Sequence, residues 1–164
     1  KTLDAFIALL RSTIGNRNEY ITIGTEIENL KNYVLINNTR YGDRVTVEYV
    51  MTPGCENCKI PKMILQPFIE NAFFHAFPYE AEGKIRVFVR REEGNLQIKI
   101  ADNGIGMSPN ELGRLGEKTE HFSGIGINNV DDRLKLLYGN EFGIRIESEE
   151  NKGTTVTIAV PLEE

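Results

Sequence analysis

The chain contains two pairs of segments in which apolar and polar residues alternate, and this pattern constrains the fold more than any other feature. The first pair is residues 84–91 (KIRVFVRR) and 96–102 (LQIKIAD), joined by EEGN. The second is residues 143–148 (GIRIES) and 153–162 (GTTVTIAVPL), joined by EENK. Alternating runs with turn-rich connections predict β-hairpins whose strands have one buried and one exposed face. The resulting sheet needs a cover on one face only.

Apolar residues at helical spacing supply that cover. They occur in residues 1–15, 25–41, 68–77 (FIENAFFHAF) and 127–139. We expect Thr25 and Glu28 to cap the second helix and Pro61 to open the third. The expected helices come first, one further helix lies between strands, and paired strands close the chain. This order predicts an α+β fold. More specifically, we expect a two-layer α/β sandwich with a mixed, mostly antiparallel sheet, helices on one face and a preceding helical segment.

Charge and composition exclude some classes of function. The 164 residues carry a net charge of −5, which argues against a nucleic-acid surface. No apolar run approaches the length of a membrane span, and the opening KTLDAFIALL reads like the middle of a helix, as in a piece of a longer protein. Cys55 and Cys58 form one CENC pair, which favours reduced thiols in a turn over a shared intermolecular metal or a redox pair.

Strand parity places two polar side chains at the end of the buried face. Leu96, Ile98 and Ile100 share one face of their strand, and Asp102 is the next residue of that parity. In the last strand, Thr154 extends the stripe of Val156, Ile158 and Val160 in the same way. An apolar floor with two directional polar groups is typical of a small-molecule site. The alternative for Asp102 is that it caps the turn of DNG.

Two Gly-x-Gly motifs flank one segment rich in glycine and charge. They are DNGIG (residues 102–106) and SGIGI (residues 123–127), and the second opens a helix. Glycines let the backbone approach a ligand closely, and a helix N-terminus favours phosphate. The segment Met107–Ser123 between them is predicted to be a lid, with one short helix capped by Ser108 and Glu111.

Polar residues interrupt the apolar run FIENAFFHAF. Asn71 and His75 are four residues apart and share one helix face, with Glu70 about a quarter-turn away. An Asn oxygen is a suitable ligand for Mg²⁺, which also offsets the repulsion between an acidic chain and a triphosphate. His75 taken alone is more often a satisfied core histidine.

The same residues carry a family resemblance. ENAFFH, DNGIG, SGIGINNV and GTTVTIAVP, in this order and spacing, resemble the N box and glycine boxes of the GHKL (Bergerat) ATP-binding fold. Gyrase B, MutL, heat-shock chaperone ATPases and histidine kinases share that fold. Residues 9–15, 26–44, 60–77 and 124–139 further resemble LytS/YesM-like sensor histidine kinases, so the resemblance covers nearly the whole chain.

The resemblance implies a role for each matched residue. Asp102 accepts a hydrogen bond from the adenine amino group, Thr154 supports the same ring directly or through water, and Asn71 holds Mg²⁺ on the phosphates of ATP. His75 lies near the ribose or phosphates. Glu70 is the candidate catalytic residue and occupies the acidic position beside the magnesium Asn, a position that activates water in the ATPase relatives.

The glycines complete the implied nucleotide site. Gly104 and Gly106 let the backbone pass the base, while Gly124 and Gly126 hinge the lid and present N–H groups to phosphate, with Asn129 nearby. The sequence departs from the family pattern at three positions. The family often has Lys three residues after the position of Asn71, Gly directly after the position of His75 and a basic residue directly before the position of Asn129. Here these positions hold Phe74, Ala76 and Asn128. These departures remove positive charge near the expected phosphates.

The resulting expectation is the ATP-binding catalytic domain of a two-component sensor histidine kinase, a protein-histidine kinase that uses ATP and Mg²⁺. The alternatives are a GHKL-type ATPase, in which Glu70 activates water, and a nucleotide-regulated binding module without turnover. Residues 1–22 would end a dimerisation or linker region, and residues 23–164 would form the catalytic domain. The expected partners are a phosphoacceptor histidine domain of the same protein, within a homodimer, and a response regulator. The chain is expected to be a cytoplasmic part of a membrane-anchored protein.

Overall fold

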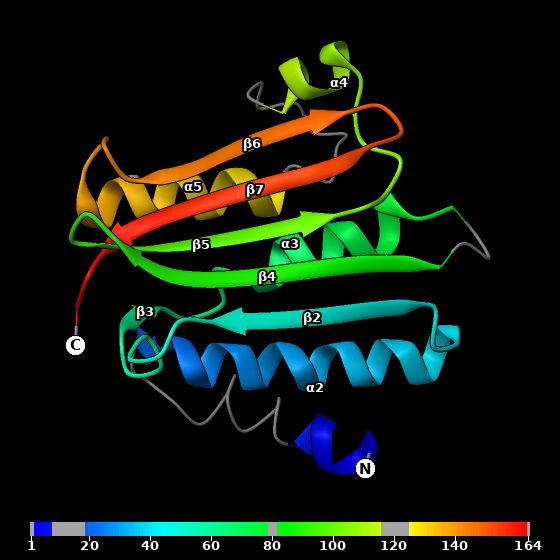
Figure 1. Ribbon diagram of the computed structural model, residues 1–164, viewed down its shortest axis with the longest axis horizontal. Coiled ribbons are helices and arrows are strands. Elements are labelled where there is room, and N and C mark those ends of the chain that lie inside the picture. The colour runs from blue at the N-terminus through cyan, green and yellow to red at the C-terminus, as the bar shows by residue number, and fades with distance from the viewer. Residues whose placement is uncertain (1, 8–18, 79–81, 116–124, 164) are drawn as a thin grey trace.

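A five-stranded sheet forms one layer of the fold. The computed structural model describes residues 2–7, 19–78, 82–115 and 125–163. The strand order is β2-β4-β5-β7-β6, in which only the β2–β4 pair is parallel (Figure 1). The strands of this sheet are β2 (Val45–Met51), β4 (Gly83–Glu92), β5 (Asn95–Asp102), β6 (Gly143–Glu149) and β7 (Gly153–Pro161). Both predicted hairpins, β4–β5 and β6–β7, are confirmed.

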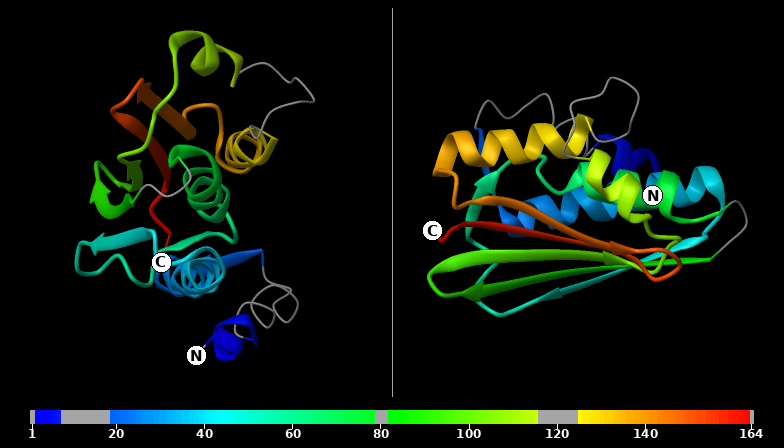
Figure 2. Two further views of the ribbon diagram at one scale, coloured as in Figure 1. Left: turned by 90° about the vertical axis from the view of Figure 1, so that its right-hand side faces the viewer. Right: turned by 90° about the horizontal axis from the view of Figure 1, so that it is seen from above.

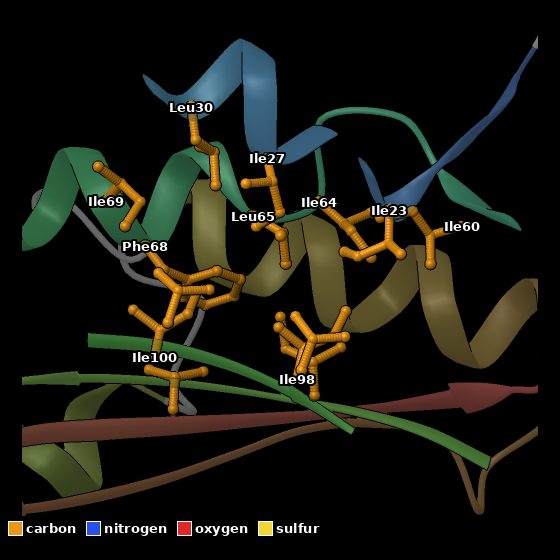
Figure 3. Close-up of a cluster of buried hydrophobic side chains, with 14 of the residues drawn as sticks. Ile23, Ile27, Leu30, Ile60, Ile64, Leu65, Phe68, Ile69, Ile98 and Ile100 are labelled. Carbon is orange, nitrogen blue, oxygen red and sulfur yellow. The ribbon is translucent and has the colours of Figure 1, made fainter. Parts of the chain in front are cut away.

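Helices cover one face of this sheet (Figure 2). They are α2 (Ile23–Tyr41), α3 (Gln66–Asn71), the π-helical turn η1 (Ala72–Ala76) and α5 (Ile125–Tyr138). The short helix α4 (Pro109–Arg114) lies beyond β6 at the edge of the sheet and has no buried residue (Figure 1). Figure 3 shows Leu30, Phe68 and Ile69 from the helices facing Ile98 and Ile100 of the sheet, and all five side chains are buried. The expected α+β two-layer sandwich is therefore confirmed, because one apolar face of the sheet is closed by apolar helix stripes.

The third helix begins later than the sequence predicted. Pro61 does not open it; this proline ends β3 (Lys59–Pro61), which pairs with β1 (Tyr20–Thr22) in a small second sheet. Helix α3 starts at Gln66, and Pro67 occupies its first turn. A proline fits there because the first N–H groups of a helix have no intrahelical partner. Three-residue strands carry too little alternation to be recognised in advance, which explains the error.

The predicted cap of the second helix was also wrong. Thr22, and not Thr25, is the N-cap, and its hydroxyl accepts the Thr25 N–H at 3.2 Å. Carbonyl oxygens of the CENC turn accept the N–H groups of the first two helical residues. Ile23 N–H donates to Cys58 O at 2.8 Å and Gly24 N–H donates to Glu56 O at 3.0 Å. The helix can begin earlier than expected because a distant loop satisfies its first N–H groups. Both cysteine thiols of this turn are free and buried.

The N-terminal helix is described only in part. Residues 2–7 are helical, and the remainder of the helix predicted over residues 1–15 lies outside the described residues. Its apolar stripe faces solvent here, with Leu3 69 % and Phe6 50 % exposed. Within the described part of the chain, no helix is both long and apolar enough to cross a membrane.

Candidate functional site

A cavity lies between the α3–η1 helix and the start of α5 on one side and strands β5, β6 and β7 on the other. It holds about 650 Å³ of empty space when the open solvent at its mouth is included. Its floor is apolar, formed by side chains such as Ile100, Ile146 and Val156. Five residues predicted from sequence line it together: Asn71, His75, Asp102, Gly106 and Thr154.

Asp102 stands where the buried stripe of β5 ends, as strand parity predicted. Its Oδ1 accepts the N–H of Gly104 at 2.8 Å and the N–H of Thr154 at 3.2 Å. The carboxylate thus caps the DNG turn and also lines the cavity, so its role as a cap is compatible with a place in the cavity wall. Burial raises the pKa of Asp102, and the two backbone N–H groups oppose this only in part. Because both bonds use Oδ1, Oδ2 is the oxygen available to a ligand.

Thr154 reaches the same end of the cavity from β7. Its hydroxyl lies 2.8 Å from the hydroxyl of Ser148, its partner across the β6–β7 pair. Ser148 also bonds to Gly153 O at 3.1 Å and accepts the N–H of Met107 at 2.9 Å. The Ser148 hydroxyl therefore links strands β6 and β7 to the loop after β5 through hydrogen bonds.

Asn71 and His75 line the opposite side of the cavity, from the end of α3 and from η1. The chain winds from an α-helix into a π-helical turn at Ala72. This wider turn keeps residues four apart on one side of the helix, so the shared face predicted for Asn71 and His75 is present. His75 is exposed to solvent and is not a core histidine.

Glu70 points elsewhere in this structure. Its Oε1 accepts the Gln66 side-chain N–H at 2.9 Å, and its carboxylate lies against Tyr33 of α2. Burial, followed by the nearby charge of Glu70, raises the pKa of Tyr33. Phe74 lies one turn further along and contacts the Tyr41 ring edge-on, with centroids 5.8 Å apart. Of the described residues, neither Glu70 nor Phe74 is among those lining the cavity.

Backbone atoms of neighbouring segments leave no room for a side chain at the two glycines of DNGIG. A Cβ on Gly104 would lie 2.3 Å from Ala76 O, and one on Gly106, whose φ is +64°, would lie 2.0 Å from Glu149 O. The loop is held between them, because the Ile105 N–H donates to Ala76 O at 2.8 Å. These glycines allow the loop to pass between η1 and the β6–β7 hairpin, which positions the Asp102 end of the cavity.

The second glycine motif is described from Ile125 onward, so Gly124 lies outside the described residues. A Cβ on Gly126 would meet the Pro67 ring at 3.3 Å, so this glycine allows α5 to start close to α3. Asn129 is exposed on α5 and, within the part of the chain described, is not a lining residue.

The predicted lid is described up to Leu115. Ser108 caps α4 with the expected capping box, in which its hydroxyl accepts the Glu111 N–H and the Glu111 carboxylate accepts the Ser108 N–H. Met107 and Leu115 line the cavity at the two ends of this short helix. The remainder of the predicted lid, residues 116–123, lies outside the described residues.

Comparison with known proteins assigns the chain to a family. The family described as histidine kinase-, DNA gyrase B-, and HSP90-like ATPase matches residues 59–164. The chain belongs to this family. The expected GHKL resemblance is thereby confirmed, and a second family, described as histidine kinase, matches residues 1–45.

Similar sequences are sensor kinases. The sensor histidine kinase YesM of Bacillus subtilis (strain 168) is 33 % identical over 98 % of this chain and 27 % of that protein. The sensor protein LytS of the same organism is 32 % identical over 92 % of this chain and 26 % of that protein. The chain thus spans about a quarter of the length of these curated relatives.

Solved structures of two histidine kinases show the same fold. A catalytic domain of histidine kinase ThkA superposes with a TM-score of 0.67 at 15 % identity, covering 88 % of this chain and 95 % of that one. The Acinetobacter baumannii histidine kinase AdeS superposes with a TM-score of 0.62 at 16 % identity, covering 99 % of this chain and 77 % of that one.

Two residues that sequence reasoning missed support the site of this histidine kinase-like ATPase domain. One is Ser148, described above, which became visible only through strand pairing. The other is Glu26, a carboxylate only 2 % exposed. Its two oxygens accept the N–H groups of Met63 at 3.1 Å and Leu65 at 3.2 Å, directly before α3. The available signal was its place on the buried face of α2, between Ile23 and Leu30.

Proposed function

We propose that this chain is the ATP-binding catalytic part of a two-component sensor histidine kinase. The observation that carries the proposal is the cavity itself, in which Asp102 and Thr154 face Asn71 and His75 across an apolar floor. The floor suits the faces of an adenine ring, and the Asp102 carboxylate suits its amino group. Family membership and similarity to sensor kinases along the whole chain support the same conclusion.

Magnesium fits the charge of this site. The described residues that line the cavity include no lysine or arginine, and the chain as a whole carries a net charge of −5. A triphosphate in such a place needs positive charge from a bound cation. Asn71 offers an amide oxygen, and Mg²⁺ commonly takes one or two protein ligands together with phosphate oxygens and water. When bound, the ion neutralises charge on the phosphates and orients them.

The other predicted residues complete the proposed site. His75 would contact the ribose or phosphates, and Gly124, Gly126 and the start of α5 would present N–H groups to phosphate, with Asn129 nearby. Glu70 would act as the acidic group beside Asn71, which requires its carboxylate to leave the bond from Gln66. Catalysis would then consist mainly of positioning the γ-phosphate for attack by a histidine.

The wider architecture is part of the proposal. Residues 1–22 would form the end of a dimerisation or linker region, and residues 23–164 the catalytic domain. The exposed apolar stripe of residues 2–7 supports a partner helix there. The full-length protein would be a membrane-anchored homodimer with this part in the cytoplasm, and it would pass phosphate to a response regulator.

A transfer assay in two parts tests the function. The first part incubates the 164-residue chain with γ-labelled ATP and magnesium, where we expect no stable label on the protein. The second part adds a longer fragment of the same protein that contains the expected phosphoacceptor histidine and carries Asp102→Asn, which weakens its own ATP binding, at an ATP concentration well below the Kd of that variant. Alkali-stable, acid-labile label on the longer fragment is the expected result.

The rival functions give different products. Release of labelled inorganic phosphate without labelled protein, abolished by Glu70→Gln, would identify an ATPase. Bound ATP with neither product would identify a nucleotide-regulated binding module. A matched reaction in which the 164-residue chain also carries Asp102→Asn controls for contaminating kinases.

A further inference from the structure

The hydroxyl of Ser148 has three hydrogen-bond partners. It lies 2.9 Å from the N–H of Met107, 3.1 Å from the carbonyl oxygen of Gly153 and 2.8 Å from the hydroxyl of Thr154. Thr154 lines the cavity, whereas Ser148, itself a described residue, is not among the lining residues. Any effect of Ser148 on a ligand therefore passes through the two lining residues that it contacts, Thr154 and Met107.

Only one assignment of donors and acceptors makes all three of these contacts hydrogen bonds. A serine hydroxyl carries one hydrogen and two lone pairs. The carbonyl of Gly153 can only accept, so the hydrogen of Ser148 is donated there. The N–H of Met107 can only donate, so it takes one lone pair. The remaining lone pair of Ser148 faces the Thr154 oxygen at 2.8 Å, and this contact is favourable only when Thr154 donates its own hydrogen.

The hydroxyl of Thr154 is thereby left with lone pairs alone for the cavity. The nearby carboxylate of Asp102 is also an acceptor, with Oδ1 occupied by the N–H groups of Gly104 and Thr154 and Oδ2 available. This end of the cavity consequently presents acceptors from both side chains. A ligand that places an amino group there is matched, and one that places a carbonyl oxygen there is not.

We propose that Ser148 is a positioning residue that holds the Thr154 hydroxyl as an acceptor and so makes the site select 6-amino over 6-oxo purines. The inference rests on the proposed binding of ATP and adds the residue that sets its base selectivity. If the Thr154 hydroxyl hydrogen pointed into the cavity, lone pairs of the Thr154 and Ser148 oxygens would face each other at 2.8 Å. The alternative is that Ser148 donates its hydrogen to Thr154 and loses its hydrogen bond to the carbonyl oxygen of Gly153. Ser148, on the neighbouring strand β6, therefore sets whether the Thr154 hydroxyl donates or accepts toward the cavity.

Binding of Mg-ATP and Mg-ITP by the 164-residue chain tests this inference. ITP carries a 6-oxo group where ATP carries a 6-amino group, and the two share the same ribose and triphosphate. We expect the parent chain to prefer ATP. Ser148→Ala frees the Thr154 hydrogen to donate into the cavity, so the ratio of ATP to ITP affinity should fall by at least about fivefold. Ser148→Thr, which restores a hydroxyl, should recover the ratio.

A second substitution tests the same polarity should Ser148→Ala fail to fold. Thr154→Val removes the hydroxyl and should also lower the ratio, while Thr155→Val, on the other face of the same strand, should leave it unchanged. A role limited to packing or to the Met107 N–H would weaken both nucleotides alike and keep the ratio constant. ATP binding with ratios within twofold of the parent in the folded variants would overturn the inference. Binding of neither nucleotide by the parent would instead contradict the proposed function, and this inference with it.

Discussion

Replacement of Asp102 by asparagine should separate ATP affinity from fold stability. The asparagine side chain has nearly the same shape and can take either of two orientations. With its oxygen in the place of Oδ1, it keeps the bonds from Gly104 N–H at 2.8 Å and Thr154 N–H at 3.2 Å. With its amide NH₂ there, it opposes both donors and loses two bonds of roughly 0.5–1.5 kcal/mol each. The first orientation should therefore dominate in the folded chain.

That orientation points the NH₂ group of the variant at the ligand. The adenine amino group then meets a donor where it met a carboxylate oxygen. Loss of a hydrogen bond to a charged group corresponds to about 1.5–3 kcal/mol, or roughly 10- to 100-fold in affinity at 1.4 kcal/mol per tenfold change. Fold stability at neutral pH should change little or rise, because the variant keeps the internal bonds of Asp102 and buries no charge.

The pH dependence of this difference follows from the raised pKa of Asp102. Burial is the main cause, opposed in part by the N–H groups of Gly104 and Thr154. Because the folded-state pKa is higher than the unfolded one, the stability contributed by Asp102 is fully present below the ordinary value of 3.8 and is lost as pH rises through the folded-state pKa. Asparagine does not titrate, so the variant does not lose this stability as pH rises. The unfolding free energy of the parent should therefore fall relative to that of Asp102→Asn as pH rises from 3.8 through the folded-state pKa of Asp102.

Titration calorimetry with Mg-ATP and urea unfolding between pH 4 and 8 measure both quantities. Asp43→Asn, which neutralises an exposed acid, is the matched control for net charge and should change neither. An Asp102→Asn affinity within twofold of the parent would remove this carboxylate from base recognition. An affinity loss matched by an equal loss of stability would indicate a packing defect in place of a lost ligand contact.

Other parts of the site should respond in distinct ways. Asn71→Ala should weaken binding of Mg-ATP at least about tenfold more than binding of adenosine, since Asn71 acts on the phosphates through the metal; equal losses in calorimetry would point to a packing effect on the helix. Gly106→Ala should lower the unfolding free energy by at least about 1–3 kcal/mol, because its φ is +64° and its Cβ would lie 2.0 Å from Glu149 O; an unchanged urea midpoint would contradict this. Amide exchange in residues 107–115 should slow when Mg-ATP binds, and equal protection with and without nucleotide would argue against a lid.

Strand parity was the most informative local signal for the site. It placed Asp102 and Thr154 on the buried face before any contact was known, because alternate residues of a strand point to opposite sides. Helical spacing placed Asn71 and His75 on one shared helix face, and the capping box at Ser108 was confirmed. These features depend on residues within one element, so the sequence contains them directly.

Errors and omissions arose where a partner was distant in sequence. The true cap at Thr22 depends on carbonyl groups of the CENC turn, and Glu26 receives N–H groups from residues almost forty positions later. The placement of Pro61 in a strand required a three-residue partner at Tyr20–Thr22. Local periodicity says which face of an element is buried, but it does not say which element will lie against that face.

The sequence by itself determined the strands of the main sheet, the apolar faces of the helices that cover it and the polar residues that stand where the buried stripes end, because periodicity and glycine placement are local properties of the chain. Only the tertiary structure decided how those residues are oriented. It turned Glu70 toward Gln66 and Tyr33, and it paired Ser148 with Thr154 through the β6–β7 register. The polarity of a hydroxyl depends on which atoms surround it within about 3 Å, and that neighbourhood exists only once distant strands and helices have packed.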